Sequence, residues 1–167
     1  MNKIIILDGA YGVGKTTVAN YVCEISEGSY ICIDPDEYFN NNLERYFLWG
    51  WPIPDNKAIL LEIRKEVEKS IKEKNIVIPV TLNATKYKQV WIHSFQGLGE
   101  LHHIVLLAER EQLLRRISSD TQRDKTLAME RLDDNLSYYQ GIIEGSYKID
   151  TSNTDSQIVA KMILGLV

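Results

Sequence analysis

The sequence predicts an α/β fold in which helices cover both faces of a parallel β-sheet. Short β-branched runs alternate with amphipathic stretches along the chain, and a glycine-rich segment directly follows the first run. Right-handed helical crossovers return each strand in the same direction, so the strands are expected to be parallel. In sheets of this kind, ligands bind at the carboxyl ends of the strands. We therefore expect the functional site among the polar residues that follow the strands.

Five short apolar runs have the length and β-branched content of strands. They are Lys3 to Asp8, Tyr30 to Asp34, Ile76 to Val80, His102 to Leu107 and Tyr147 to Asp150. Between them, apolar residues recur at the spacing of one helix face. These stripes are Val18, Val22 and Ile25; Leu60, Ile63, Val67 and Ile71; Tyr87, Val90, Trp91 and Leu98; Met129, Leu132, Leu136, Tyr139 and Ile143; and Ile158, Met162, Ile163 and Leu166. We expect residues 1–167 to form a single domain, since this length suffices for one hydrophobic core.

The segment from Gly9 to Thr16, here called the phosphate loop, reads Gly-Ala-Tyr-Gly-Val-Gly-Lys-Thr. It has the phosphate-binding pattern Gly-x-x-x-x-Gly-Lys-Ser/Thr and lies between a predicted strand and a predicted helix, as that pattern requires. Its glycines let backbone N–H groups turn towards a phosphate, with the positive N-terminus of the helix behind them. Lys15 is expected to reach the β- and γ-phosphates, and the Thr16 hydroxyl is expected to bind Mg²⁺.

The phosphate loop predicts a nucleoside triphosphate site with ATP and Mg²⁺ as cofactors. Guanine-specific proteins of this kind would need an Asn/Thr-Lys-x-Asp tetrapeptide after the first strand, and the sequence has none, so ATP is preferred. The residues expected to contact the nucleotide are Gly9, Ala10, Tyr11, Gly12, Val13, Gly14, Lys15, Thr16, Thr17 and Arg116.

The segment Asp34-Pro35-Asp36-Glu37 closes the second predicted strand and supplies two carboxylates at the expected ligand edge. Such groups hold the water shell of Mg²⁺ or accept a proton from an attacking hydroxyl. Asp34 and Asp36 are therefore candidate catalytic residues, and Asp34 is also a candidate metal ligand; which of them is the base is left open. Alternatively, Asp36 caps the following helix. The third strand ends in Thr81 without an acidic residue, so Mg²⁺ falls to Thr16 and these carboxylates, with Asp8 as a weaker substitute.

Arginines follow the fourth predicted strand in a pattern typical of a lid. A helical segment carries Arg116, a short polar stretch carries Arg123 and a second helical segment carries Arg131, with the lid itself expected at about 116–126. An arginine that neutralises a phosphoryl group in transfer is worth about 10³ to 10⁵ in rate. We therefore predict catalytic roles for Arg116 and Arg123; alternatively, the Arg116 guanidinium stacks on the adenine. For Arg131, a role in the site and simple surface exposure are equally open.

An aromatic insert at about 38–54 interrupts the alternation of strands and helices. It contains Tyr38, Phe39, Tyr46, Phe47, Trp49 and Trp51, together with prolines and asparagines that break helices. The rings either line an acceptor pocket or cap the core, and the sequence leaves both open. His93, His102 and His103 lack metal-ligand spacing, and the last two point to opposite faces of one strand. We assign no histidine to catalysis and expect no zinc site.

Composition limits the partners of the chain. A net charge of −4 argues against binding to duplex nucleic acid, because such binding needs many Lys and Arg residues. Cys23 and Cys32 are not spaced as metal ligands, and we expect both to be reduced and buried. No stretch approaches the roughly 18 apolar residues of a membrane span, and the first apolar run lacks a signal-peptide cleavage region. We therefore expect a cytoplasmic protein whose partners are ATP and a small-molecule acceptor.

Together these features resemble the P-loop kinase superfamily of nucleoside, nucleotide and small-metabolite kinases. The sequence is particularly similar to the tunicamycin-resistance-like ATP-binding proteins within it. The matching stretches are Asp8–Thr16, Asp34–Glu37, Ile78–Leu82 and Glu111–Arg116, and the ending Ile149–Ser152 also fits the superfamily. The resemblance implies a three-layer α/β/α P-loop NTPase fold with a five-stranded parallel sheet and a helical lid, ATP with Mg²⁺, and a nucleoside-like or antibiotic acceptor. It carries over Lys15 and Thr16 as phosphate and metal residues, Asp34 and Asp36 as the acceptor and metal side, and Arg116 and Arg123 as lid residues.

The leading hypothesis is an ATP-dependent phosphotransferase that transfers the γ-phosphate to a small hydroxylated acceptor. Asp34 or Asp36 would orient or deprotonate the acceptor hydroxyl. The alternative is an ATP-gated binding protein, in which ATP orders the lid and the aromatic insert around a ligand or partner. A kinase of nucleic-acid ends or nucleotide-sugars ranks last, because the acidic charge disfavours long polynucleotides.

Overall fold

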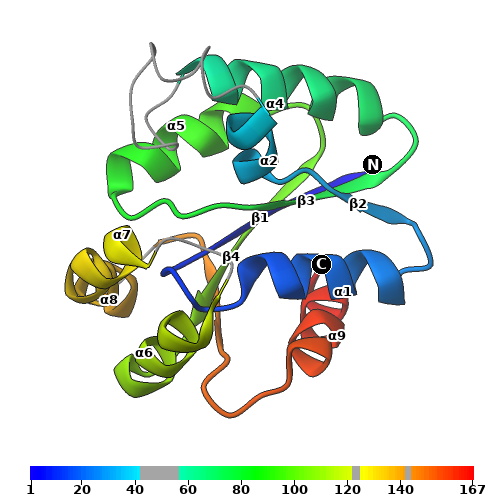
Figure 1. Cartoon of the computed structure of the whole chain (residues 1–167). Helices are drawn as coiled ribbons and strands as arrows, with labels where there is room; N and C mark the ends of the chain where they lie inside the picture. The colour runs from blue at the N-terminus through cyan, green and yellow to red at the C-terminus, as the bar shows by residue number, and fades with distance from the viewer. Residues whose placement is uncertain (42–56, 122–124, 142–143) are drawn as a thin grey trace.

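The computed structural model describes residues 1–41, 57–121, 125–141 and 144–167, with the backbone alone for residues 39–41. Along this part of the chain, each strand is followed by one or more helices (Figure 1). The strands are β1 (Lys3–Gly9), β2 (Tyr30–Cys32), β3 (Asn75–Pro79), β4 (Glu100–Leu107) and β5 (Tyr147–Asp150). The helices are α1 (Lys15–Ile25), α2 (Pro35–Asn41), α4 (Lys57–Ser70), α5 (Thr85–Phe95), α6 (Arg110–Ser119), α7 (Thr126–Glu130), α8 (Leu132–Gln140) and α9 (Ser156–Leu166). The predicted α/β class is confirmed.

The five strands are parallel and form one sheet in the order β2-β3-β1-β4-β5, which confirms the predicted sheet. β1 lies at its centre and pairs with β3 from Ile4↔Ile76 to Leu7↔Pro79. On its other side it pairs with β4 from Lys3↔Glu100 to Gly9↔Leu106. The chain thus builds one half of the sheet with β2 and β3 before it crosses β1 to build the other. The carboxyl end of β1 is therefore the switch point at which ligands bind in open parallel sheets.

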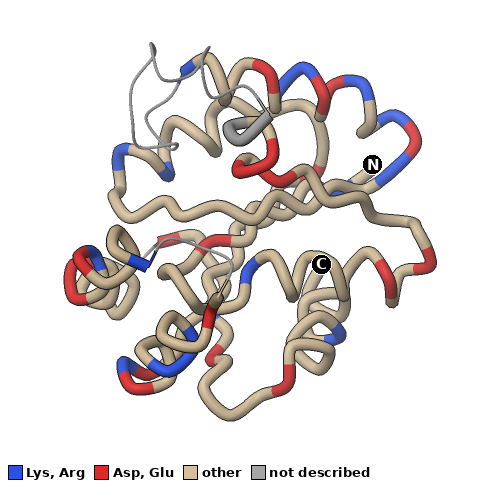
Figure 2. The backbone as a smooth tube through the Cα atoms, in the orientation of Figure 1, with Lys and Arg blue, Asp and Glu red and all other residues tan. Residues whose placement is uncertain are grey.

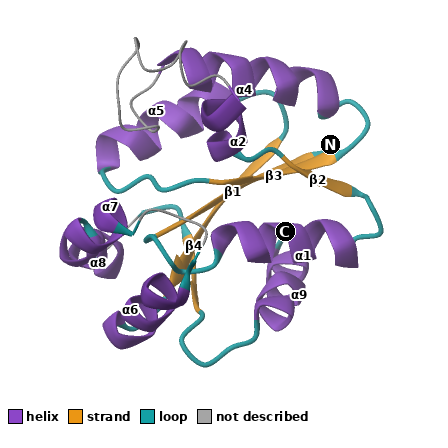
Figure 3. Cartoon of the chain, in the orientation of Figure 1, coloured by secondary structure: helices purple, strands orange, loops and turns teal. Residues whose placement is uncertain are grey.

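Helices cover both faces of the sheet, so the molecule has three layers (Figure 3). α4 and α5 lie against one face, and α1 and α9 lie against the other. Side chains of β1 alternate between the two cores: Ile4 and Ile6 pack in the core that contains Trp91, whereas Ile5 and Leu7 pack in the core that contains residues of α1 and α9. Because the centre of the sheet is buried on both sides, β1 and β3 contain continuous apolar runs in the sequence, whereas in the edge strand β5 only Ile149 is buried.

The bounds of β1, β3 and β4 differ from the prediction by one or two residues, and two further differences concern the end of β2 and the stripe that begins at Met129. β2 ends at Cys32 and not at Asp34, because α2 begins at Pro35 and Asp34 is already part of the helix start. The stripe predicted from Met129 to position 143 forms two helices, α7 and α8, which meet at Arg131; position 143 itself lies outside the described residues. A periodic apolar stripe continues through such a junction, so periodicity alone did not reveal it.

The predicted apolar face of α9 is wrong in part. Ile158, Met162 and Leu166 are exposed. The residues of α9 that pack in the core with α1 are Val159, Ala160 and Ile163. The helix is apolar on two neighbouring stripes, and helical periodicity cannot tell which of them faces the protein.

Charged residues lie mainly on the helices, and α4 carries both signs along its length (Figure 2). Arg64 and Glu68 of α4 form an ion pair at 2.8 Å, and Glu66 and Lys69 form another at 3.9 Å. These pairs are partly exposed, and Arg64 also donates from Nη1 to the carbonyl oxygen of Ser94 in α5. Within the described ranges, none of the helices has the length and apolar character to cross a membrane.

Candidate functional site

The phosphate loop leaves the carboxyl end of β1 at the centre of the sheet. Gly9, Gly12 and Gly14 have φ angles of 149°, 77° and 98°, which residues with a Cβ rarely adopt. An added Cβ at Gly9 would lie 2.6 Å from the carbonyl oxygen of Leu106, and one at Gly12 would lie 2.8 Å from Cγ1 of Ile117. A Cβ at Gly14 would meet no atom of the described residues within 4 Å. The first two glycines therefore allow close packing, whereas Gly14 keeps the surface open at the start of α1.

The start of α1 offers donors to an anion. Gly14 holds the N-cap position and provides no side-chain partner for the backbone N–H groups of the first turn, which includes the exposed Thr17. Nζ of Lys15 donates to the carbonyl oxygens of Gly9 and Ala10 at 2.9 and 3.0 Å. The helix dipole, the amides and an ammonium group thus converge at one point, which suits a polyphosphate.

Thr16 of α1 and Asp34, which directly precedes α2, meet beside the loop. Thr16 Oγ1 donates to Asp34 Oδ2 at 3.3 Å. Asp34 is buried, and this burial raises the pKa of its carboxyl, while the hydrogen bonds from Asp36 N and Thr16 lower it. The structure therefore brings together the two predicted metal ligands, which both present oxygen atoms of the kind that Mg²⁺ prefers.

The cap of α2 is Asp34 and not Asp36, which corrects the alternative role considered for Asp36. Oδ1 of Asp34 accepts a hydrogen bond from the backbone N–H of Asp36 at 2.9 Å, and α2 begins at Pro35. The reason is Pro35, because proline favours the first helical position and leaves the cap to the residue before it. Asp36 is exposed in the first turn of α2.

Tyr11 of the phosphate loop lies among charges from two other segments. Burial raises the pKa of its hydroxyl most, Asp36 raises it further, and Arg131 lowers it. Nζ of Lys15 is 5.9 Å from the centre of the Tyr11 ring. The phenol is therefore neutral at physiological pH, and the charges of Asp36 in α2 and of Arg131 at the junction of α7 and α8 act on it in opposite directions.

Arg116 of α6 joins the phosphate loop to the segment after β5. Its Nη1 donates to the carbonyl oxygen of Val13 and to Oγ1 of Thr151, both at 3.2 Å, and its Nη2 donates to the carbonyl oxygen of Thr151 at 2.9 Å. Thr151 is buried, and its hydroxyl also donates to the carbonyl oxygen of Leu107 at 3.0 Å. The guanidinium thus holds backbone atoms of two loops. Arg123 and residues 42–54 of the predicted aromatic insert lie outside the described residues.

A cavity of about 170 Å³ opens next to Ala10, at the carboxyl ends of β4 and β5. Leu106, Glu109, Leu136 and Asp150 are among the residues that line it. Sites for drug-sized ligands begin at roughly 300 Å³, so this cavity is too small for a whole nucleotide.

A buried network around Asp8 escaped the sequence analysis. Oδ1 of Asp8 accepts hydrogen bonds from Gly9 N, Leu82 N and the Tyr139 hydroxyl at 2.7, 2.8 and 2.6 Å. Oδ2 lies 3.1 Å from Nε2 of His103, and Asp8 is 0% exposed. Both oxygens are therefore engaged inside the protein, and Asp8 is not the substitute metal ligand that the sequence suggested. The one available signal was a carboxylate at the end of an otherwise apolar strand.

The residues beside the loop fit a magnesium–triphosphate group. Amides and Lys15 provide positive charge, and Thr16 and Asp34 provide two oxygen ligands. Nowhere in the described part of the chain do three or more His, Cys, Asp or Glu residues gather as a metal site. Mg²⁺ does not need such a cage, because it keeps several waters and takes the rest of its ligands from one or two carboxylates and from substrate phosphates.

No protein-family model and no curated protein matches the sequence. Solved structures, however, are similar over almost the whole chain. The tunicamycin resistance protein of Deinococcus radiodurans has a TM-score of 0.73 at 20% identity, over 99% of this chain and 95% of that chain. The APS kinase of Mycobacterium tuberculosis, in complex with AMPPNP and APS, has a TM-score of 0.73 at 15% identity, over 99% and 96% of the two chains. Shikimate kinase from Acinetobacter baumannii, in complex with shikimate, has a TM-score of 0.67 at 20% identity, over 99% and 93%.

The chain therefore has the fold of the P-loop kinases. The suspected resemblance to this superfamily is confirmed at the level of the fold, and so is the three-layer α/β/α class with its five-stranded parallel sheet. At identities of 20% and below, the likeness extends no further than the fold, so the activity has to be argued from the site.

Proposed function

We propose that the protein is an ATP-dependent phosphotransferase that acts on a small hydroxylated acceptor. The observation that carries this proposal is the contact between Thr16 Oγ1 and Asp34 Oδ2 at 3.3 Å, directly beside the uncapped start of α1 and the Lys15 ammonium. An anion-binding helix start next to two hard oxygen ligands is the arrangement that a magnesium–triphosphate complex requires.

In this proposal the amides of the phosphate loop and Lys15 bind the β- and γ-phosphates. Lys15 would exchange its hydrogen bonds to the carbonyl oxygens of Gly9 and Ala10 for phosphate oxygens. Thr16 and Asp34 would hold Mg²⁺, which when bound neutralises charge on the phosphates. The raised pKa of the buried Asp34 carboxyl supports this role, because a nearby cation would stabilise the ionised form.

Asp36 is then the residue on the acceptor side. Its carboxylate is exposed and is not the cap of α2, whereas Asp34 is buried and its Oδ1 caps that helix. Asp36 would orient the acceptor hydroxyl and accept its proton, and Tyr11 and Arg131, which interact electrostatically, would bind other polar groups of the acceptor. Positioning of this kind is most of what a phosphoryl-transfer enzyme has to provide.

Arg116 and Arg123 have different roles in this proposal. Arg116 is engaged by Val13 and Thr151, which supports a role in holding the nucleotide loops together. Arg123 remains the predicted residue for neutralising the phosphoryl group in transfer. The acceptor class rests on the fold alone: similar structures include a sugar kinase, a gluconokinase and a shikimate kinase, besides the tunicamycin resistance protein. A nucleoside-like or antibiotic acceptor is therefore one group among the small hydroxylated molecules to be tested.

A coupled ADP-release assay with Mg·ATP tests the proposal over a panel of sugars, shikimate, nucleosides and nucleoside antibiotics. We expect one acceptor class to raise ADP release above the intrinsic rate and to yield a phosphorylated product by mass spectrometry. Asp36→Asn should then lower kcat by about 10²- to 10⁴-fold, the usual contribution of a general base, with little change in nucleotide affinity. Glu37→Gln is the matched control, because Glu37 is exposed in the same helical turn.

The proposal fails if no acceptor raises the rate and Asp34→Asn leaves the intrinsic ATPase rate unchanged. ATP-dependent binding of an acceptor in calorimetry, without any phosphorylated product, would instead favour the ATP-gated binding protein.

A further inference from the structure

The network around Asp8 lies directly beneath the phosphate loop and takes no part in the chemistry proposed above. Asp8 and His103 lie on neighbouring strands, and their side chains are 0% and 1% exposed. A carboxylate in such a place is costly unless it is paired and hydrogen-bonded. Its partners are therefore expected to have a purpose beyond filling the core.

On its inner side the network ties together three walls of the site. Oδ1 of Asp8 receives the first amide of the phosphate loop, Gly9 N, at 2.7 Å. The same oxygen receives Leu82 N, from the segment after β3, at 2.8 Å and the Tyr139 hydroxyl, from α8, at 2.6 Å. Burial raises the pKa of Tyr139 well above its usual value, so its hydroxyl keeps the proton that it donates.

On its outer side the network reaches the surface through His103. Nε2 of His103 faces Asp8 Oδ2 at 3.1 Å, and Nδ1 lies 2.6 Å from Oγ of Ser146. Lys88 Nζ donates to the same Oγ at 3.1 Å and also to the carbonyl oxygen of Glu144. Among the described residues, His103 is the one donor to Oδ2 of Asp8, and Ser146 and Lys88 fix the orientation of its ring.

We propose that His103 is a positioning residue, which acts through Asp8 to hold the Gly9 amide in the phosphate loop and Tyr139 of α8 in their binding geometry. His103 does not contact the nucleotide itself. It orients the Asp8 carboxylate, which in turn accepts hydrogen bonds from the Gly9 amide and Tyr139. The proposal rests on the proposed function in one respect, since the effect is expected in the affinity for Mg·ATP. Mutations in such a connecting network typically change the coupling to a binding site by roughly 2- to 30-fold.

The test compares His103→Leu with His103→Gln in the full chain. Leucine removes the donor to Asp8, whereas the side-chain amide of glutamine restores an N–H near the position of Nε2. His102→Leu is the control, because His102 is the neighbouring residue of β4 and points to the other face of the sheet. Fluorescence titration with mant-ATP and Mg²⁺ measures affinity, and hydrogen exchange of the Gly9 amide in the nucleotide-free protein measures the loop directly.

His103→Leu is expected to weaken mant-ATP binding at least about fivefold and to speed exchange at Gly9, while His103→Gln and His102→Leu stay within about twofold of the wild type. The inference is overturned if His103→Leu binds as the wild type does, or if glutamine is no better than leucine. Should His103→Leu fail to fold, Tyr139→Phe takes its place: it removes a different donor from Asp8, and unchanged affinity and unchanged exchange at Gly9 would again overturn the inference. If the wild type itself binds no mant-ATP, the proposed function fails, and the exchange of Gly9 still decides the role of His103.

Discussion

Replacing Arg116 by alanine is expected to lower the free energy of unfolding by about 2–4 kcal/mol. The guanidinium makes one hydrogen bond of ordinary length, to the carbonyl oxygen of Thr151 at 2.9 Å. Two longer ones, at 3.2 Å, go to Thr151 Oγ1 and the carbonyl oxygen of Val13. A hydrogen bond to a charged group contributes about 1.5–3 kcal/mol, and the longer contacts of a half-buried side chain add less. The loss would also release the phosphate loop from the segment after β5, so nucleotide affinity should fall as well.

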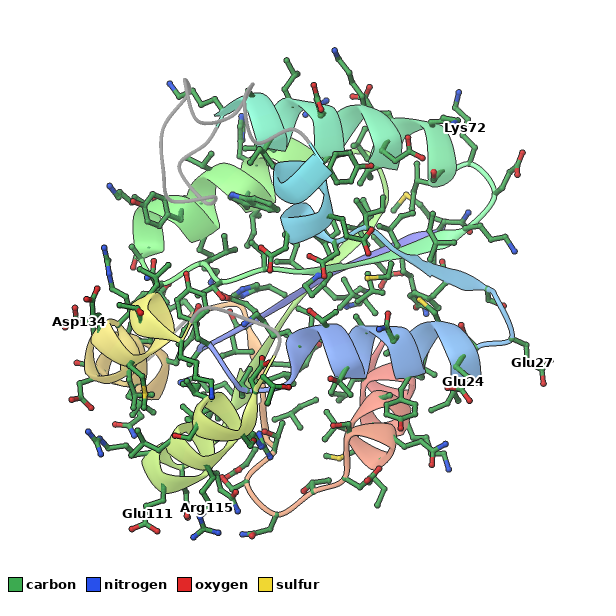
Figure 4. All side chains as sticks on the ribbon, in the orientation of Figure 1. Glu24, Glu27, Lys72, Glu111, Arg115 and Asp134 are labelled. Carbon is green, nitrogen blue, oxygen red and sulfur yellow. The ribbon has the colours of Figure 1, made fainter. Side chains whose placement is uncertain are left out.

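Urea denaturation followed by fluorescence measures this change, with Arg115→Ala as the control. Arg115 lies on the same helix, and Figure 4 shows Arg115 and Glu111 pointing away from the body of the protein. Their exposed ion pair spans 3.7 Å, so its loss should change stability by less than about 0.5 kcal/mol. Arg116→Lys should recover only part of the loss, because one ammonium cannot replace the planar fork of the guanidinium.

One result would refute this reasoning. If Arg116→Ala keeps the stability of the wild type within about 0.5 kcal/mol while kcat falls by about 10³-fold or more, Arg116 acts on the phosphoryl group in transfer and not as a clamp. Lower stability and weaker nucleotide binding, with kcat close to that of the wild type, are the results expected from the contacts to Val13 and Thr151.

Three further predictions concern stability and reactivity. Burial raises the pKa of Asp34, so the ionised carboxylate destabilises the fold above that pKa. Asp34→Asn should therefore stabilise the nucleotide-free protein near pH 7 and lose this advantage near pH 4. Urea titrations at both pH values would check this. Burial, as the main cause, raises the pKa of Cys32 to about 12, so its thiol is protonated near pH 8. Iodoacetamide should therefore modify Cys23 first. Peptide mass spectrometry that showed the reverse order would contradict this. Gly9→Ala should destabilise the protein by about 1–3 kcal/mol more than Gly14→Ala. Both positions have positive φ, but only the Cβ at Gly9 would lie 2.6 Å from a backbone oxygen. Equal losses of stability in thermal unfolding would count against that packing.

The central strands of the sheet could be predicted because strands buried on both faces are continuous apolar runs, which can be recognised without knowing their partners. Strand order is different. β1 pairs with β3 and β4, and residues such as Ile5, Val77 and His102 meet across it although they are far apart in the sequence. No local pattern ranks such pairings. The exposed Met162 of α9 shows the same limit, because an apolar helix face is defined only by what packs against it.

The site divides in a similar way. The phosphate loop is a local motif, and Asp34 and Asp36 follow a strand. The loop and the two aspartates could therefore be found from the sequence. The division of roles between the two carboxylates depends on which one receives an amide of α2, and that requires coordinates. Asp8 and His103 are 95 positions apart, and neither has a sequence context that points to the other.

Two buried carboxylates flank the phosphate loop, and the difference between them locates the chemistry. Asp8, before the loop, receives three donors on one oxygen and His103 on the other, so its charge is compensated within the protein. Asp34, beside the end of the loop, has one amide on Oδ1 and on Oδ2 only the long contact of 3.3 Å from Thr16. A buried carboxylate with such weak compensation is destabilising, unless a cation joins it. The Asp8 carboxylate therefore has a full set of hydrogen-bond donors and is structural. The Asp34 carboxylate has few donors on the side where Mg²⁺ and the phosphates would bind.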